Sequence, residues 1–350
     1  MTIFLHIGHH KTGTTSIQAA LHHNRQRLRD TYSINYPDFA QNHWPFAAPF
    51  LSGERFAFFR TLDTDPEVGR LGERAVEQFR KDVARYRTHV LSAEDFFHLH
   101  RPTLENLRRF FGETGHDVRV IAYVRHPADL ASSKLNQRVV LGVATLDDFN
   151  VRPNFAKIAL ENYVAAFGRE AITVRRFGAP YFKGGDLMED FLSLIHPEPV
   201  VLEPTGTRNE SMTTPSLRLI EALNRIAPKG TPGRASHSYL RRIDGPKFKA
   251  PRAVVEKFLA EQSESLAYFA SEFGLRFDDV DLSKFPEAMD VEFSDETIAS
   301  IAKILNEQSV EIRTLKAELA RLGRRADRRP LGRLLAKLRG SPKAPAEGAL

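Results

Sequence analysis

Hydrophobic positions along the chain recur with two periods and predict alternating strands and helices. Short apolar or β-branched runs predict strands at residues 3–7, 33–39, 89–91, 117–124 and 172–177. Apolar positions near the 3.6-residue period predict helices that start at Ser16 and Pro127 and cover residues 71–86, 155–167, 187–195, 215–226, 254–273 and 297–322. This alternation predicts an α/β fold with a central parallel sheet and helices on both faces.

The loop after the first strand has the composition of an anion site. It reads GHHKTGTT from Gly8 to Thr15 and leads directly into a helix. A strand, a glycine-containing loop and a helix N-terminus together present backbone N–H groups and the positive end of the helix dipole. The alternative is a simple Gly-Thr turn with Thr14 or Thr15 as the helix N-cap. We expect a phosphate group to bind here.

The position of the lysine distinguishes this loop from the Walker A pattern, G-x4-G-K-[ST]. Gly8 and Gly13 have the Walker spacing, but Thr14 stands where the lysine belongs and Lys11 lies inside the loop. A lysine at this position approaches a phosphate from a different side.

The segment 11–16 resembles the loop with which sulfotransferases bind the 5′-phosphosulfate of 3′-phosphoadenosine 5′-phosphosulfate (PAPS). It is most similar to bacterial and glycan-type members, which read KTGTT, and it differs from the aryl-type PKSGTTW at Thr12 and Ser16. The resemblance implies a three-layer P-loop-like fold, PAPS as donor, 3′,5′-bisphosphoadenosine (PAP) as product and no metal. It also implies a set of cofactor contacts: Lys11, Thr12, Gly13, Thr14, Thr15 and Ser16.

A second strand-loop-helix unit follows residues 117–124. Arg125 ends the strand, Pro127 starts a helix, and Ser133 stands eight residues after the arginine. This spacing resembles the second sulfotransferase signature, whose arginine and serine bind the 3′-phosphate. A guanidinium can hold a phosphate through two hydrogen bonds while a hydroxyl completes the shell. Two such units predict a ligand with two separate anionic ends.

A candidate base follows the strand at residues 89–91. Ser92 and Asp95 have the spacing of a capping box, which leaves Glu94 without a structural role. A carboxylate at the carboxyl end of a central parallel strand lies where such sheets bind ligands. In the family that the chain resembles, a strand ending in S-x-E often supplies the catalytic base, so Glu94 is predicted as that base. A solvated acid in the first helical turn is the alternative.

Four histidines stand near these motifs. His98 is an alternative base, and it forms an H-x-H pair with His100. On a helix, residues i and i+2 do not share a face, so the pair does not predict a metal site. The sequence suggests no role for His9 and His10 beyond lining the loop.

Two later segments carry weaker signals. Arg208 and Asn209 precede Ser211 in an Asn-x-Ser pattern that family members often carry, which implies cofactor or loop contacts; a simple N-cap fits equally well. The basic segment 229–252, rich in glycine and proline, is predicted to be a lid over the nucleotide, a docking surface for an anionic acceptor, or a solvated loop.

Charge divides the chain into two parts. Residues 313–339 hold ten Lys and Arg residues against Glu318 and Asp327, a net +8 that exceeds the +6 of the whole chain. The rest is therefore close to neutral, which argues against a nucleic-acid partner. We expect one sulfotransferase-like domain at 1–312 and a basic, partly helical or disordered tail at 313–350. Leucines spaced along the tail suggest a basic amphipathic helix on an anionic membrane; solvated disorder is the alternative.

The composition is that of a soluble globular protein. The chain has no cysteine, and no run of eighteen apolar residues occurs in it. With the first predicted strand at residue 3, no room is left for a signal sequence. We expect a cytoplasmic, bacterial protein that can lie at the inner membrane face through 313–339.

The resemblance implies a PAPS-dependent sulfotransferase that acts on a hydroxyl or amine, and we expect a carbohydrate or a glycolipid as the acceptor. One alternative is a P-loop kinase of a small molecule or glycan, in which Glu94 or Asp95 would hold Mg²⁺. Another is a non-catalytic nucleotide- or glycan-binding module at the membrane surface.

Overall fold

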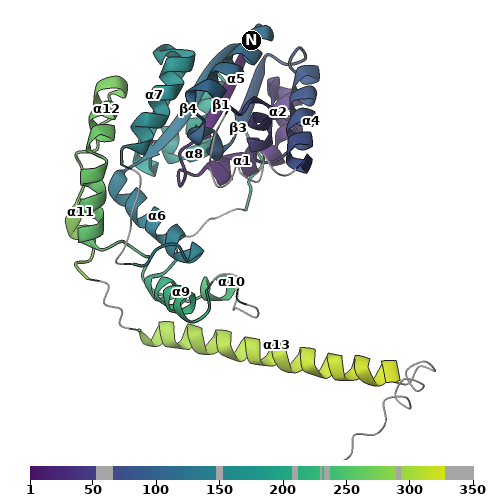
Figure 1. Ribbon diagram of the computed structural model, residues 1–350, viewed down its shortest axis with the longest axis vertical. Helices are drawn as coiled ribbons and strands as arrows, with labels where there is room; N and C mark the ends of the chain where they lie inside the picture. Colours follow the sequence, from purple (N-terminus) through teal and green to yellow (C-terminus); the bar gives the residue numbers. More distant parts are fainter. Residues whose placement is uncertain are drawn as a thin grey trace, which may run out of the picture.

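A single five-stranded sheet organises the computed structural model (Figure 1), which describes residues 1–52, 66–146, 153–206, 212–228, 231, 237–288 and 293–327. Its strands are β1 Thr2–Gly8, β2 Ile34–Asn35, β3 Thr88–Ser92, β4 Asp117–Arg125 and β5 Ile172–Phe177. They lie in the order β2-β3-β1-β4-β5, and every neighbouring pair is parallel. The predicted α/β class with a parallel central sheet is confirmed, and the strand predicted at 33–39 is a two-residue strand at the edge.

Helices connect the strands and continue after β5. They are α1 Thr14–His23, α2 Arg25–Tyr32, α4 Pro66–Asp82, α5 Arg101–Glu113, α6 Pro127–Leu141, α7 Phe155–Phe167, α8 Leu187–Ile195, α9 Thr214–Ile226, α10 His237–Leu240, α11 Arg252–Glu261, α12 Ser263–Phe273 and α13 Asp295–Asp327. Short 3₁₀ helices include η1 Trp44–Phe50 and η2 Glu94–His98. The helices predicted at 155–167 and 187–195 have the observed bounds.

Both faces of the sheet are buried, which gives three layers. On one face, Ile3, Leu5 and Ile7 of β1 pack with side chains of α4, α5 and α7. On the other face, Ile121 and Tyr123 of β4 pack with α1, α2 and α8. Because side chains alternate along a strand, burial on both sides requires a continuous apolar run, as β4 has. A separate apolar cluster joins α6, α9 and α11.

The single helix predicted at 254–273 is wrong, because the chain breaks into α11 and α12 at Gln262. Asn154, just before α7, forms hydrogen bonds with backbone groups at the break. Its N–H donates to the Glu261 carbonyl at 3.1 Å, and its side-chain oxygen accepts from the Ser265 N–H at 3.0 Å. A contact from a segment more than a hundred residues away therefore interrupts a helix that the local pattern continues.

The last described helix extends further than its pattern predicted. Its 33 residues run to Asp327, past the predicted end at residue 322, and the helix crosses the expected boundary between residues 312 and 313. Whether the two expected parts form one domain stays a prediction. In the part of the chain that the structure describes, no helix has the length and apolar character needed to span a membrane.

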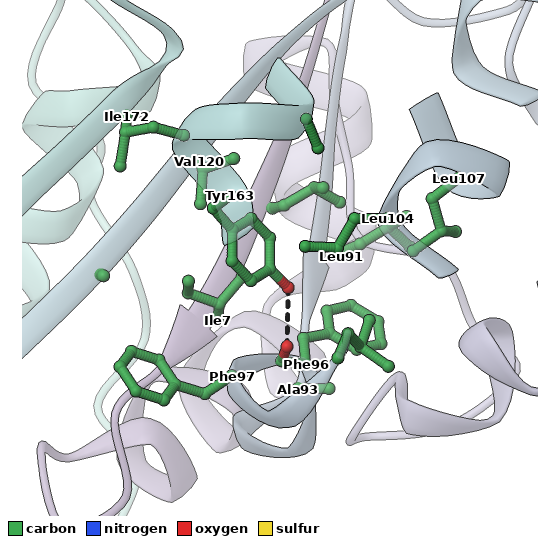
Figure 2. Packing of buried hydrophobic residues seen from close by; sticks show 14 of the residues in the cluster. Ile7, Leu91, Ala93, Phe96, Phe97, Leu104, Leu107, Val120, Tyr163 and Ile172 are labelled. Atoms are coloured by element: carbon green, nitrogen blue, oxygen red, sulfur yellow. Dashed lines mark hydrogen bonds between the residues drawn. The ribbon is translucent and has the colours of Figure 1, made fainter. Parts of the chain in front are cut away.

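A buried tyrosine ties α7 to the turn that carries Glu94. Tyr163 is fully buried, and its hydroxyl donates to the Phe96 carbonyl of η2 at 2.7 Å. Figure 2 shows this bond inside the apolar cluster, beside Ile7 and Leu91. Burial raises the pKa of the Tyr163 hydroxyl, so it stays protonated as a donor.

We expect Tyr163→Phe to destabilise the protein by about 1–3 kcal/mol, because it leaves the buried Phe96 carbonyl without this donor. Urea unfolding of both proteins measures the difference. Tyr32→Phe is the matched control: its hydroxyl accepts from the Val201 N–H at 3.1 Å near the surface, where water can replace the bond, so the loss should be smaller. Equal losses in the two variants would contradict the assigned role of the buried bond.

Candidate anion-binding and catalytic site

Three predicted site segments meet at the carboxyl edge of the sheet because β1 lies between β3 and β4. The loop 8–13 follows β1, Glu94 follows β3, and Arg125 ends β4. One Arg125 guanidinium nitrogen donates to the Lys11 carbonyl at 3.4 Å. A Cβ added at Gly8 would lie 3.3 Å from the Glu94 Cα. The structure thus brings together Lys11, Glu94 and Arg125, which are far apart in the sequence.

The loop closes around the His9 carbonyl. The Thr12 hydroxyl donates to it, and the Thr14 hydroxyl approaches it at 3.5 Å. Lys11 and Gly13 have left-handed backbones, with φ of 68° and 73°, so the chain turns sharply into α1. Gly13 is the N-cap of α1, which means that the alternative with Thr14 or Thr15 as the cap is wrong: both residues lie inside the helix.

Gly13 also allows close packing beneath the loop. A Cβ at this position would lie only 2.4 Å from the Leu187 Cδ2 atom and 3.2 Å from a ring carbon of Phe177. Any larger residue would therefore have to displace the first residue of α8 or the end of β5.

The N-terminus of α1 presents backbone N–H groups at this loop. The N–H groups of Thr14 and Thr15 belong to the first turn, where no intrahelical carbonyl can accept from them. No acidic residue occupies this turn, so the positive end of the dipole is not neutralised from within the helix. Thr14 is buried, Ser16 is half-buried and Thr15 is exposed.

Positive charge converges on the same loop. Burial lowers the pKa of Lys11, Arg241 and Arg125 lower it further, and Glu94 acts in the opposite direction. Burial also lowers the pKa of Arg125, whose guanidinium lies 5.7 Å from the Phe177 ring centroid. A bound anion would stabilise these partly desolvated cations.

Glu94 is paired with a histidine of the loop. The Nδ1 atom of His10 lies 3.4 Å from Glu94 Oε2, and its Nε2 atom lies 2.7 Å from the Nε2 atom of His98. The hydrogen bond from His10 lowers the pKa of Glu94 and outweighs the opposing effect of burial. A neutral imidazole has one donor and one acceptor nitrogen, so His10 can donate to Glu94 and accept from His98. The result is a continuous chain from Glu94 to His98.

Buried histidines beneath this chain fix the ends of β1 and β3. The hydroxyl of Ser92 lies 2.8 Å from His6 Nδ1, and the Ser92 N–H donates to His43 Nδ1 at 3.1 Å. Burial lowers the pKa of His6 and of His43 to about 3, so both rings are neutral. The predicted capping box is wrong, because Ala93 is the N-cap of η2 and no side chain caps it.

Of the other predicted cofactor contacts, the structure describes Ser133 but not Arg208 and Asn209. Ser133 is half-buried in the second turn of α6, and no hydrogen bond in the described chain joins it to Arg125. The neighbouring Ser132 hydroxyl accepts from the Ala250 N–H at 3.0 Å. Arg208 and Asn209 lie outside the described residues, as do parts of the predicted lid 229–252. No group of three metal-ligating side chains that could hold an ion occurs among the described residues.

Sequence reasoning missed the His10–His98 contact. The two residues stand 88 positions apart, and His98 is held against the Phe155 ring, with centroids 4.9 Å apart. The available signal was topological: in a parallel sheet with β1 beside β3, the loop after β1 must lie next to the turn after β3.

Comparison with known proteins identifies a similar solved structure but no matching family. No family model matches the chain, and no curated protein matches it. Among solved structures, it is similar to a sulfotransferase from Alicyclobacillus acidocaldarius, with 14% identity, 80% of this chain and 97% of that chain covered, and a TM-score of 0.38. A TM-score this low does not support an argument from shared structure.

Replacing His10 should change the acidity of Glu94. We expect His10→Ala to raise the pKa of Glu94, because the carboxylate loses the hydrogen bond that favours its charged form. A carboxyl-carbon NMR titration of Glu94 measures this shift. His98→Ala is the control: His98 contacts His10 at 2.7 Å, and its charge is a smaller cause of the lowered Glu94 pKa than the His10 hydrogen bond, so the change should be smaller. An unaltered Glu94 titration in His10→Ala would refute the pairing.

Proposed function

We propose that the chain is a sulfotransferase that moves a sulfuryl group from PAPS to an acceptor hydroxyl or amine. The observation that carries the proposal is the convergence of Lys11, Glu94 and Arg125 at one edge of the sheet. Two basic strand-loop-helix units on the adjacent strands β1 and β4 suit a donor with anionic groups at two positions. The Glu94 carboxylate, which follows the third strand, β3, supplies a base at the same edge.

The loop residues are assigned to the 5′ end of the donor. The first-turn N–H groups of α1 and the Lys11 ammonium bind the 5′-phosphosulfate, with Thr12, Gly13, Thr14, Thr15 and Ser16 forming the cradle. The left-handed glycine and the absence of acid in the first turn support this assignment. Arg125 and Ser133 bind the 3′-phosphate, and Arg208 and Asn209 remain proposed further contacts.

Glu94 acts as the general base. Its lowered pKa keeps it ionised near neutral pH, so it can take the proton of the acceptor as the acceptor atom bonds to sulfur. The bond between sulfur and the bridging phosphate oxygen breaks, and Lys11 neutralises the charge left on that oxygen. In-line group transfer depends mainly on positioning and charge stabilisation. His10 and His98 hold the carboxylate in place.

The finer assignments belong to the same proposal. The acceptor is a carbohydrate, free or lipid-linked, the product nucleotide is PAP, and 1–312 is the catalytic unit. The basic residues of 313–339 are proposed to contact an anionic membrane surface at its cytoplasmic face.

Nucleotide binding tests the proposal directly. We expect calorimetric titration with PAP to show binding to the wild type, and Lys11→Ala or Arg125→Ala to weaken it about tenfold or more, because each removes charge-assisted hydrogen bonds worth about 1.5–3 kcal/mol. Arg119→Ala is the matched control, since Arg119 lies on the same strand as Arg125 but donates to the Glu170 carbonyl. Absence of PAP binding, or activity on ATP that EDTA abolishes, would exclude the sulfotransferase.

The base is tested separately from binding. Glu94→Gln should keep PAP affinity and lose nearly all transfer, because the amide cannot accept the proton. The measurement is turnover of PAPS with a panel of sugar acceptors. Retention of most activity in Glu94→Gln would remove the base assignment and leave the nucleotide site intact.

Two neighbouring arginines test the proposed lid. Arg241 lowers the pKa of Lys11 through its charge, while Arg242 pairs with Glu307 of α13 at 2.6 Å. We expect Arg241→Ala to weaken PAP binding several-fold, because it removes positive charge beside the loop. Arg242→Ala should weaken it less, because it removes only the ion pair that holds this segment on α13. Equal effects in the titration would argue against a lid that acts through Arg241.

A further inference from the structure

The sequence of α13 carries a strict seven-residue repeat. The repeated, mostly apolar residues are spaced alternately by three and four residues over almost the whole helix. The first position of each heptad is taken by Ile298, Leu305, Ile312 and Leu319, and the fourth by Ile301, Gln308, Leu315 and Leu322. The repeat ends there, because Ala326 and Arg329 follow in these places. A 3.5-residue period with apolar first and fourth positions is the pattern of a coiled coil.

We call these eight residues the seam of α13. Its apolar side chains are mostly exposed: Leu305 by 58%, Ile312 by 52% and Leu319 by 68%. Along a helix the seam from residue 298 to 322 is about 37 Å long. From residue 309 to 322 every side chain is exposed, and Figure 1 shows α13 continuing beyond α9 and α10.

A different stripe of α13 holds the helix on the rest of the molecule. The Thr297 hydroxyl donates to the Asp244 carbonyl at 3.0 Å, and Ile304 is buried. Further along the stripe, Glu307 pairs with Arg242, and the Tyr239 hydroxyl donates to Glu311 at 3.2 Å. The attachment of α13 therefore uses neighbouring positions. Of the seam residues, Ile301 and Gln308 are half-buried and the other six are exposed.

We propose that the seam pairs with the seam of a second copy of this chain as a parallel, in-register coiled coil. In a parallel coiled coil, the residue just before each first heptad position contacts a residue of the other helix whose number is higher by five. Glu311 of one copy then faces Lys316 of the other, twice by symmetry. Gln308 meets its own counterpart, whereas a shift by one heptad would bury it against an apolar residue.

The mass in solution tests the pairing, with full-length protein and no nucleotide, so the outcome is independent of the proposed function. We expect light scattering on a sizing column to give twice the monomer mass, and Ile312→Lys to weaken dimerisation at least about a hundredfold, since it places a charge in the seam. Val310→Lys is the matched control: Val310 is 46% exposed, lies two residues away and is outside the seam. It should stay dimeric.

Three results would overturn the pairing. They are a monomeric wild type at 100 µM, a dimer that Ile312→Lys does not weaken, and equal weakening by Val310→Lys. Circular dichroism confirms that both variants keep their helices. A monomer that co-sediments with phosphatidylserine vesicles, and loses this binding in Ile312→Lys, would identify the seam as a membrane face instead.

A charge exchange tests the parallel register. Glu311→Lys and Lys316→Glu should each weaken the dimer several-fold, because each places two like charges opposite each other. The double variant should restore the dimer, because the two charges exchange places and still attract. Only Glu311 also contacts Tyr239, so equal effects of the two single variants point to the pair between copies. Absence of rescue would exclude the parallel in-register arrangement.

Discussion

The site depends on one constraint, the position of β1 between two parallel neighbours. With β3 on one side and β4 on the other, the segments that leave the three strands must meet at one edge, since parallel strands end together. The loop 8–13, Glu94 and Arg125 are therefore neighbours before any side chain is considered. Buried polar contacts of Ser92 with His6 and His43 then fix this edge, because breaking them would leave the Nδ1 atoms of two buried neutral imidazoles without these partners.

This edge of the sheet carries two kinds of charged group, partly buried cations and one carboxylate. Lys11 and Arg125 are cations whose pKa values are lowered first by burial, which means that the fold holds them at a cost that a bound anion would offset. Glu94 is the reverse case, since its hydrogen bond with His10 lowers its pKa against burial. A carboxylate kept charged beside cations that favour an anion suits a reaction in which a proton is removed while negative charge moves toward the loop.

The sequence predicts the fold and the main site residues because both depend on local patterns and parallel topology. The apolar runs marked the central strands, and GHHKTGTT marked the loop. The features that could not be predicted depend on contacts between residues that are distant in sequence. Asn154 breaks the helix at Gln262, His98 joins His10, and Ser92 bonds to histidines instead of capping η2. No local pattern encodes such contacts, although the strand order would have placed two of them close together.

The proposed coiled coil and the proposed site share a connection through α10 and the residues after it. Tyr239 and Arg242 hold this segment against α13, and Arg241 between them acts on Lys11. A helix fixed in a dimer loses freedom to move, so the segment attached to it loses freedom as well. Preorganised positive charge binds an anion at a lower entropic cost. Dimerisation through α13 and nucleotide binding at the loop would therefore favour each other, and by linkage the effect must be reciprocal.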